Sequence, residues 1–185
     1  MTKVFEKVHV DIQDVVNSKK WFNTQVANIA RARITPNNVI GDKGLSLTFR
    51  IQPGSMYFFR YDPKFKDTLP YYDTFPLVIP YNTAPGGFIG LNMHYLDYQN
   101  RYKLFKKLLD LNGRKLDERT KIKYSWATVS AFANTLNVDK CIKHYLYEHL
   151  ASPLAKVKQE DYMTALMLPV EKFVGQTKQY IWTRN

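Results

Sequence analysis

The chain has 185 residues, a hydrophobic fraction of 45% and a formal net charge of +11. This apolar content is sufficient for a packed core and argues against wholesale disorder, and no apolar run approaches the ~20 residues that cross a bilayer. The excess of positive charge favours a polyanionic neighbour, which is either DNA, RNA or an acidic protein surface.

The only cysteine, Cys141, excludes an intrachain disulfide and a zinc cluster of cysteines. Its surroundings favour a small buried side chain. The N-terminus, "MTKVFEKVHVDIQD", lacks the apolar centre of a signal peptide. We therefore expect an intracellular or intravirion location.

Residues 1–44 predict a strand followed by a helix. Apolar and polar side chains alternate from Val8 to Ile12, which is typical of a short strand. Ser18 can cap the helix that follows. This helix must end before Pro36, because the residue that precedes a proline is disfavoured in the α region. One face of the helix is apolar and consists of Phe22, Val26, Ile29 and Ala30.

Residues 45–96 predict four or five short strands. The alternating segment "GLSLTFRI" is joined to "MYFFRY" by the turn signal Pro53–Gly54, so we expect these two strands to form a hairpin. "PLVIP" and "FIGLNMHYL" follow, separated by the turn "APGG", and Gly90 permits a close backbone approach. This spacing predicts a small antiparallel SH3-like β-barrel with 62–69 as its large loop.

Residues 97–185 predict a mainly helical part. Tyr98, Tyr102 and Phe105 recur at helical spacing and mark one apolar face. The fold class is therefore α+β, in a single domain over 1–185 that combines an N-terminal strand and helix, the barrel core and the helical part. The expected helices cover about 98–113, 122–133, 139–150 and 160–168, the last as a helix or a strand.

The sequence offers little for catalysis. His144 and His149 are too far apart along a helix, because zinc-binding helices place both histidines four residues apart. Asp62, Asp67 and Asp73 would serve a two-metal nuclease only if they converged on one point, and turn or surface roles suffice for them. We expect no enzyme activity, cofactor or metal, and keep a DNA-processing nuclease as an alternative.

The densest basic segment spans residues 101–123, where nine cations face three carboxylates and leave a charge of +6. Clustered cations suit phosphates, because each neutralised phosphate releases condensed counterions. A solvated surface is the alternative interpretation, and no pattern here indicates base-specific contacts. The candidate DNA-binding residues are Arg101, Lys103, Lys106, Lys107, Arg114, Lys115, Arg119, Lys121 and Lys123.

The segment "GSMYFFRYDPKFKDTLPYYDTFPLVIP" is rich in aromatic rings and prolines. Packing in the core, a protein-docking surface and stacking on bases all remain open, with packing favoured because a small barrel needs apolar faces. The loop in this segment supplies the candidate protein-docking residues, which are Lys64, Phe65, Lys66, Tyr71 and Tyr72.

Four segments occur in a characteristic order: "LPYYDTFPLVIP", "GFIGLNMHYL", "KCIKHYLYEHL" and "ALMLPVEKF". Together they resemble a family of small virion proteins of T-even-like myophages that includes DNA end protectors, with a neck or baseplate component as the alternative. The resemblance implies a structural role without enzyme activity and supplies no catalytic residues. The chain departs from the family pattern at "DYQNRY", where relatives carry prolines.

The leading hypothesis is a non-enzymatic virion protein that binds packaged DNA ends or the head–tail junction through a basic surface. Its expected partners are other virion proteins of the neck, portal or baseplate and double-stranded DNA bound without sequence preference, and no membrane. We expect it in the virion, and in the host cytoplasm during assembly. The alternative is a tail or baseplate subunit whose basic surface contacts only protein.

Overall fold

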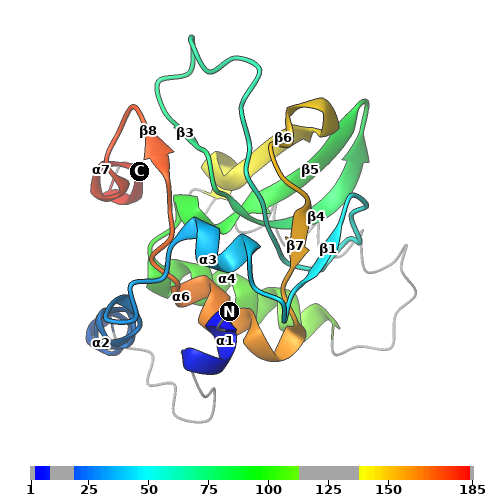
Figure 1. Cartoon of the computed structure of the whole chain (residues 1–185). Coiled ribbons are helices and arrows are strands. Elements are labelled where there is room, and N and C mark those ends of the chain that lie inside the picture. The colour runs from blue at the N-terminus through cyan, green and yellow to red at the C-terminus, as the bar shows by residue number, and fades with distance from the viewer. Residues whose placement is uncertain (1–2, 9–18, 113–137, 184–185) are drawn as a thin grey trace.

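The computed structural model describes residues 3–8, 19–112 and 138–183. Its centre is a six-stranded antiparallel sheet in the order β1-β7-β2-β4-β5-β6, beside a separate pair β3-β8 (Figure 1). The strands are β1 (Ser46–Thr48), β2 (Tyr57–Phe58), β3 (Tyr72–Asp73), β4 (Leu77–Ala84), β5 (Gly87–Asn92), β6 (Ile142–Leu146), β7 (Leu154–Lys156) and β8 (Phe173–Val174). The α-helices are α1 (Val4–Lys7), α2 (Lys19–Ala30), α3 (Pro36–Ile40), α4 (Tyr98–Asn112), α6 (Tyr162–Met167) and α7 (Lys178–Thr183).

The sheet is open and does not close into the expected barrel. β1 and β6 form its two edges. The hairpin expected between β1 and β2 is also wrong, because β7 inserts between them and pairs with both. The alternation of the first segment was misleading, since Leu47 and Phe49 are exposed and face no core. β7 lies about 100 residues further along the chain than β1 and β2, so the local sequence pattern does not predict that it pairs with them.

The β4–β5 hairpin confirms the sequence prediction, with Ala84 opposite Gly87 at its turn. Two glycines of β5 leave room for close neighbours here, a side chain at Gly90 and a backbone at Gly87. A Cβ on Gly90 would lie 2.3 Å from a methyl carbon of Val78, and one on Gly87 would lie 1.9 Å from the carbonyl oxygen of Tyr145. These contacts hold β5 tightly between β4 and β6.

The helix expected over 139–150 is wrong. Ile142–Leu146 forms the edge strand β6, flanked by the 3-10 turns Val138–Cys141 and Tyr147–His149. Pairing with β5 and stacking of Tyr145 on Phe88, with ring centroids 5.4 Å apart, outweigh the helical spacing. The described residues of the C-terminal half therefore combine strands with helices, and a mainly helical half is not confirmed.

Helices α2 and α4 agree with the sequence prediction. α2 ends before Pro36 as expected, and α3 then begins with a capping box. The Thr35 hydroxyl accepts a hydrogen bond from the Asn38 amide, and the Asn38 side chain accepts one from the Thr35 amide at 2.9 Å. No helix in the described ranges is long and apolar enough to cross a membrane. The expected strand near residue 8 and the helix over 122–133 fall outside the described residues, apart from Val8.

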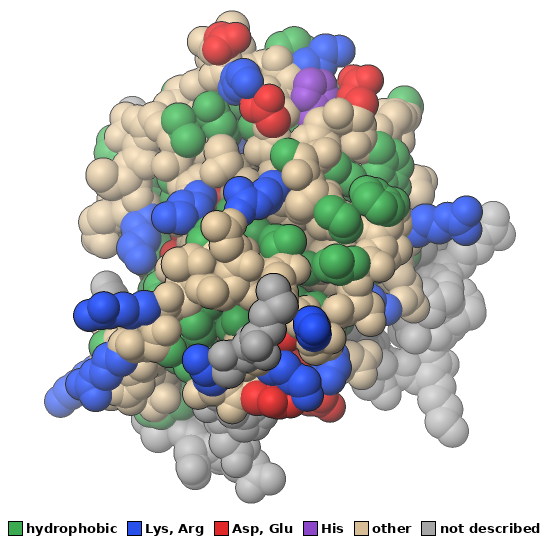
Figure 2. Space-filling model, in the orientation of Figure 1, with side chains coloured by type: hydrophobic (Ala, Val, Ile, Leu, Met, Phe, Trp, Pro, Cys, Tyr) green, Lys and Arg blue, Asp and Glu red, His purple; other side chains and the backbone are tan. Residues whose placement is uncertain are grey.

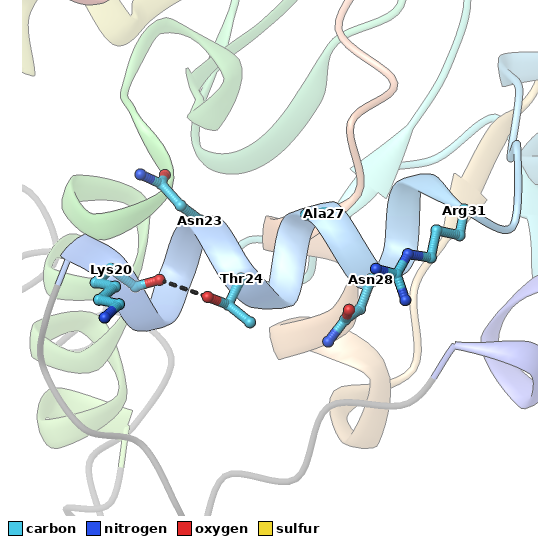
Figure 3. Close-up of a pocket in the computed structure, with 6 residues that line it drawn as sticks. All are labelled: Lys20, Asn23, Thr24, Ala27, Asn28 and Arg31. Atoms are coloured by element: carbon cyan, nitrogen blue, oxygen red, sulfur yellow. Dashed lines mark hydrogen bonds between the residues drawn. The ribbon is translucent and has the colours of Figure 1, made fainter.

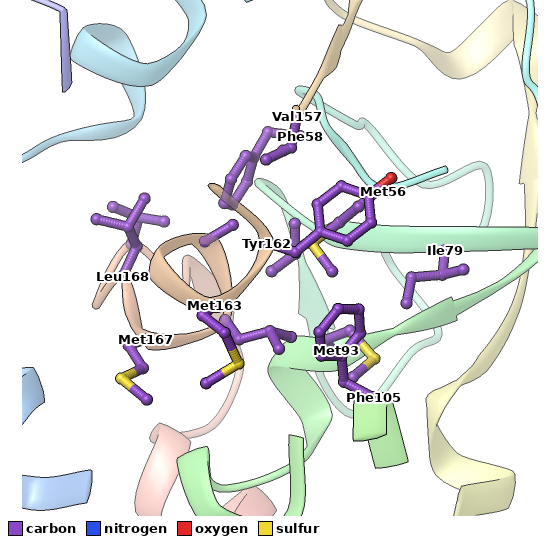
Figure 4. Close-up of a cluster of buried hydrophobic side chains, with 14 of the residues drawn as sticks. Met56, Phe58, Ile79, Met93, Phe105, Val157, Tyr162, Met163, Met167 and Leu168 are labelled. Carbon is purple, nitrogen blue, oxygen red and sulfur yellow. The ribbon is translucent and has the colours of Figure 1, made fainter. Parts of the chain in front are cut away.

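Two hydrophobic clusters lie on opposite faces of the sheet. The larger lies between the sheet and helices α4 and α6 and includes Phe58, Phe105 and Tyr162 (Figure 4). In this cluster Phe58 stacks on Phe75, with ring centroids 5.5 Å apart. The smaller collects Tyr57, Phe59 and Tyr61 around Tyr145. Neighbouring residues in and after β2 thus enter different clusters, because successive side chains of an extended chain point to opposite faces. The expected packing role is confirmed for five rings of the aromatic segment, which are buried: Tyr57, Phe58, Phe59, Tyr61 and Phe75.

Candidate nucleic-acid interface

Arg101 was expected at the DNA and is instead buried. Its side chain has no exposed surface and lies over the ring of Tyr98, with the guanidinium carbon 4.6 Å from the ring centroid. It forms an ion pair with Glu171, whose side chain is 1% exposed. Its remaining hydrogen bonds go to the carbonyl oxygens of Leu96 at 2.8 Å, Leu166 at 3.0 Å and His94 at 3.4 Å. Arg101 therefore stabilises the fold and does not face a ligand.

A second buried group adjoins this ion pair. Asp73 Oδ2 lies 2.8 Å from His94 Nδ1 and accepts a hydrogen bond from Asn92 Nδ2 at 3.2 Å. Burial raises the pKa of the Glu171 carboxyl, but the charges of Arg101, His94 and Lys178 outweigh it and hold the pKa at about 2. Three of the four segments that carry the family resemblance supply residues to this network. Their role here is structural.

The rest of the predicted basic cluster is only partly described. Lys103 and Lys106 are exposed on α4. The side chain of Lys107 is not described, and Arg114, Lys115, Arg119, Lys121 and Lys123 lie outside the described residues. The prediction of a phosphate-binding surface over 101–123 therefore stays a prediction for all of these residues, and Arg101 is removed from it.

The predicted docking residues divide between the surface and the core. Lys64 and Lys66 are exposed, and the Phe65 side chain is 63% exposed on a loop that projects beyond the sheet (Figure 1). Tyr71 and Tyr72 are half-buried, the first packed on the core and the second in β3. The 62–69 loop is anchored at its base, where the Asp62 N–H donates to the His149 carbonyl. It is also held by a contact within the loop, since Lys66 Nζ lies 2.9 Å from both Asp62 carboxylate oxygens.

The structure reveals a polar surface that sequence reasoning missed, along the exposed side of α2. We call it the α2 face. Its side chains lie along the outward side of a single helix, and all of them are exposed (Figure 3). One hydrogen bond lies within it, from Thr24 Oγ1 to the Lys20 carbonyl at 3.0 Å. The α2 face consists of Lys20, Asn23, Thr24, Ala27, Asn28 and Arg31.

Charge distinguishes the α2 face from most of the surface. The sequence from 15 to 41 holds four cations and no Asp or Glu. Figure 2 shows acidic side chains mainly at the top and base of the visible face, while Lys and Arg occupy the margin where α2 lies. Cations, amides and hydroxyls are the groups that bind phosphate oxygens in protein–DNA complexes. The α2 face is therefore suited to a polyanion.

The stability of α2 accounts for the cations at its C-terminal end but not for Lys20. Lys20 lies in the first turn, where a positive charge opposes the helix dipole. Arg31 and Arg33 follow the last turn, where a positive charge is favourable. The available signal in the sequence was the run from 15 to 41 without carboxylates, which the denser but mixed cluster over 101–123 obscured.

The aspartates considered for a nuclease do not assemble a metal site. Asp62 pairs with Lys66, and Asp73 belongs to the buried network. Within 3–8, 19–112 and 138–183, no three His, Cys, Asp or Glu residues are grouped so as to hold a metal ion. Burial raises the pKa of the Cys141 thiol to about 12, which leaves it a poor nucleophile.

The model of one protein family, described as phage T4 terminal DNA protecting protein, matches residues 7–184. The chain belongs to this family. The match spans the α2 face, the 62–69 loop and the buried network, and it confirms the resemblance drawn from the sequence segments. No curated protein and no solved structure gives a significant match to the chain. Membership of the terminal DNA protecting family gives the chain a DNA-protecting, structural role.

Proposed function

We propose that this protein binds the ends of double-stranded DNA and shields them by occupying them, without cleaving or modifying the DNA. The observation that carries the proposal is the family match over 7–184. A protector of this kind needs tight docking and positive charge, and it needs no catalytic group. The net charge of +11 is in keeping with such a role.

The α2 face supplies the contact surface in this proposal. Lys20 and Arg31 neutralise phosphates, and the amides of Asn23 and Asn28 donate hydrogen bonds to phosphate oxygens. Because such contacts release counterions, affinity should fall steeply as salt rises. Lys103 and Lys106 extend the contact if the duplex reaches α4.

We place the protein in the host cytoplasm during assembly and then in the virion. In the virion it lies at the packaged DNA end, near the head–tail junction. The 62–69 loop then docks on a virion protein of the neck, portal or baseplate. Its two cations and two carboxylates cancel, so it has no net attraction for phosphates. An ordered loop that presents Phe65 to solvent suits an apolar socket on a protein.

The competition between DNA forms tests the proposal. We expect a labelled linear duplex to be displaced by unlabelled linear DNA of the same sequence and poorly displaced by the same DNA as a closed circle. Added protein should also slow exonuclease digestion of the linear form. Equal competition by circle and linear DNA would show a general DNA binder and contradict end protection.

The mixed charge of the 62–69 loop favours one second candidate, a tail or baseplate subunit that contacts only protein. In that case the α2 face meets an acidic protein surface. Failure of the purified protein to bind any linear duplex at low salt would favour this candidate over DNA end protection.

A further inference from the structure

The α2 face has an outermost ridge with a distinctive order of side chains. At 3.6 residues per turn, Lys20, Thr24, Ala27 and Arg31 point in nearly the same direction, opposite the buried Phe22. The two ends of the ridge are long cations and its middle is small. Asn23 and Asn28 lie on either flank of this ridge (Figure 3).

We propose that α2 enters the major groove of the duplex close to its end, with the axis of the helix across the groove. This inference rests on the proposed function, since it requires that the protein binds DNA. It adds which groove is occupied and which side chains approach the bases. No base preference is implied, because the ridge presents only Thr24 and Ala27 to the groove floor.

The dimensions of α2 fit this arrangement. Lys20 and Arg31 are separated by about 16 Å along the helix axis, at 1.5 Å per residue. The major groove is about 12 Å wide, which admits an α-helix, whereas the minor groove is about half as wide. The two cations therefore reach phosphates on opposite walls of the groove. If α2 instead lay along the phosphates of one DNA strand, the small residues in the middle of the ridge would not be needed for close approach.

The middle of the ridge allows close approach. Ala27 carries a single methyl group, and the Thr24 hydroxyl already donates its hydrogen to the Lys20 carbonyl. The oxygen of Thr24 remains able to accept a hydrogen bond from a water molecule in the groove, which requires no particular base. The amides of Asn23 and Asn28, on the two flanks of the ridge, are placed to donate hydrogen bonds to phosphate oxygens on either side of the groove.

The inner side of α2 fixes the helix as a rigid element. Trp21 meets Phe22 edge to face at 5.0 Å, and Phe22 packs on Tyr102 of α4 at 5.4 Å between centroids. Ile29 is 5% exposed in the main core. The helix lies at the margin of the molecule, away from the sheet (Figure 1). A rigid helix at the periphery is suited to enter a groove without rearrangement.

Two matched substitutions test the inference. Ala27→Leu adds bulk at the centre of the ridge, while Ala30→Leu adds the same bulk on the same helix, toward its side. Both residues are exposed and leucine is a strong helix former, so neither change should unfold the protein. We expect Ala27→Leu to weaken binding to a linear duplex about tenfold, because the added side chain keeps the ridge from the groove floor. Ala30→Leu, about a quarter turn away from the ridge, should change the affinity by less than about twofold.

Dimethyl sulfate footprinting on the same linear duplex gives the second readout. It methylates guanine N7 in the major groove and adenine N3 in the minor groove. Protection of N7 near the end, lost in Ala27→Leu, supports the inference. End binding with N7 fully reactive and Ala27→Leu unimpaired overturns it and leaves end protection standing. Absence of any binding by the unmodified protein overturns both.

Discussion

Helices α2 and α4 both carry cations, but they use them differently. On α4, Arg101 points inward and pairs with the buried Glu171. On α2, Lys20 and Arg31 point outward from a stretch without carboxylates. The first charge is paired with a buried carboxylate, whereas Lys20 and Arg31 form no ion pair with any residue of 3–8, 19–112 or 138–183. Charge density along the sequence therefore does not identify the surface that meets a polyanion; the direction of each side chain and its internal partners decide it.

The largest effect should come from removing the inward-facing charge of Arg101, which lowers the free energy of unfolding. Arg101→Met leaves the buried Glu171 with only Lys178, whose Nζ lies 3.8 Å from Oε2, and removes the hydrogen bonds of the guanidinium to three carbonyl oxygens. We expect a loss of roughly 3–5 kcal/mol in the free energy of unfolding. Urea titration measures it. Lys103→Met, the same type of change at an exposed position of α4, should cost less than about 0.5 kcal/mol. Similar losses for the two variants would contradict a structural role for Arg101.

The same ion pair should make stability depend on acid. The folded pKa of Glu171, about 2, lies below its ordinary value of 4.5, so its contribution is complete above pH 4.5 and is lost as pH falls toward 2. We expect the contribution to be about 3 kcal/mol. In Glu171→Gln this part of the acid dependence should be missing. If the free energies of unfolding of the unmodified protein and of Glu171→Gln fell in parallel between pH 4.5 and 2, the ionised Glu171 carboxylate would not contribute to stability.

Reversing the outward-facing charges should affect DNA and not the fold. We expect Lys20→Glu with Arg31→Glu to lower duplex affinity about 100-fold at low salt and to reduce the salt slope by about two. Stability should change by less than about 0.5 kcal/mol, because both side chains are exposed. Fluorescence anisotropy over a salt series measures the affinity. An unchanged slope would remove the α2 face from the interface.

The smallest effect is expected at the 62–69 loop. Its cations are balanced by carboxylates, so Lys64→Ala with Phe65→Ala should alter duplex affinity by less than about twofold. The same anisotropy assay applies. A loss comparable to that of the α2 variant would mean that Phe65 contacts DNA, and would remove the distinction between the two exposed regions.

Local patterns in the sequence predicted α2, α4 and the β4–β5 hairpin. Their signals, a helical apolar face and a glycine turn, lie within the elements themselves. β6 and β7 were missed because their pairing partners are distant in the chain, and Ile142–Leu146 becomes a strand only against β5. Non-local pairing of this kind overrides helical spacing.

The site shows the same limit. Arg101 lies three residues after Tyr98 and shares the apolar face of α4, so its helical position already indicated burial, although its basic neighbours suggested otherwise. Its partner Glu171 is far along the chain and left no mark in the local pattern. The α2 face had a signal in the run from 15 to 41 without carboxylates, but neutral residues such as Asn23 and Asn28 carry no obvious binding pattern.

The most direct test of the central claim is the exonuclease half-life of a linear duplex with the unmodified protein or with the Lys20→Glu, Arg31→Glu variant. We predict that the unmodified protein prolongs the half-life and that the variant, although folded, does not. The Lys64→Ala, Phe65→Ala protein should protect as well as the unmodified one. Full protection by the α2 variant would contradict the account.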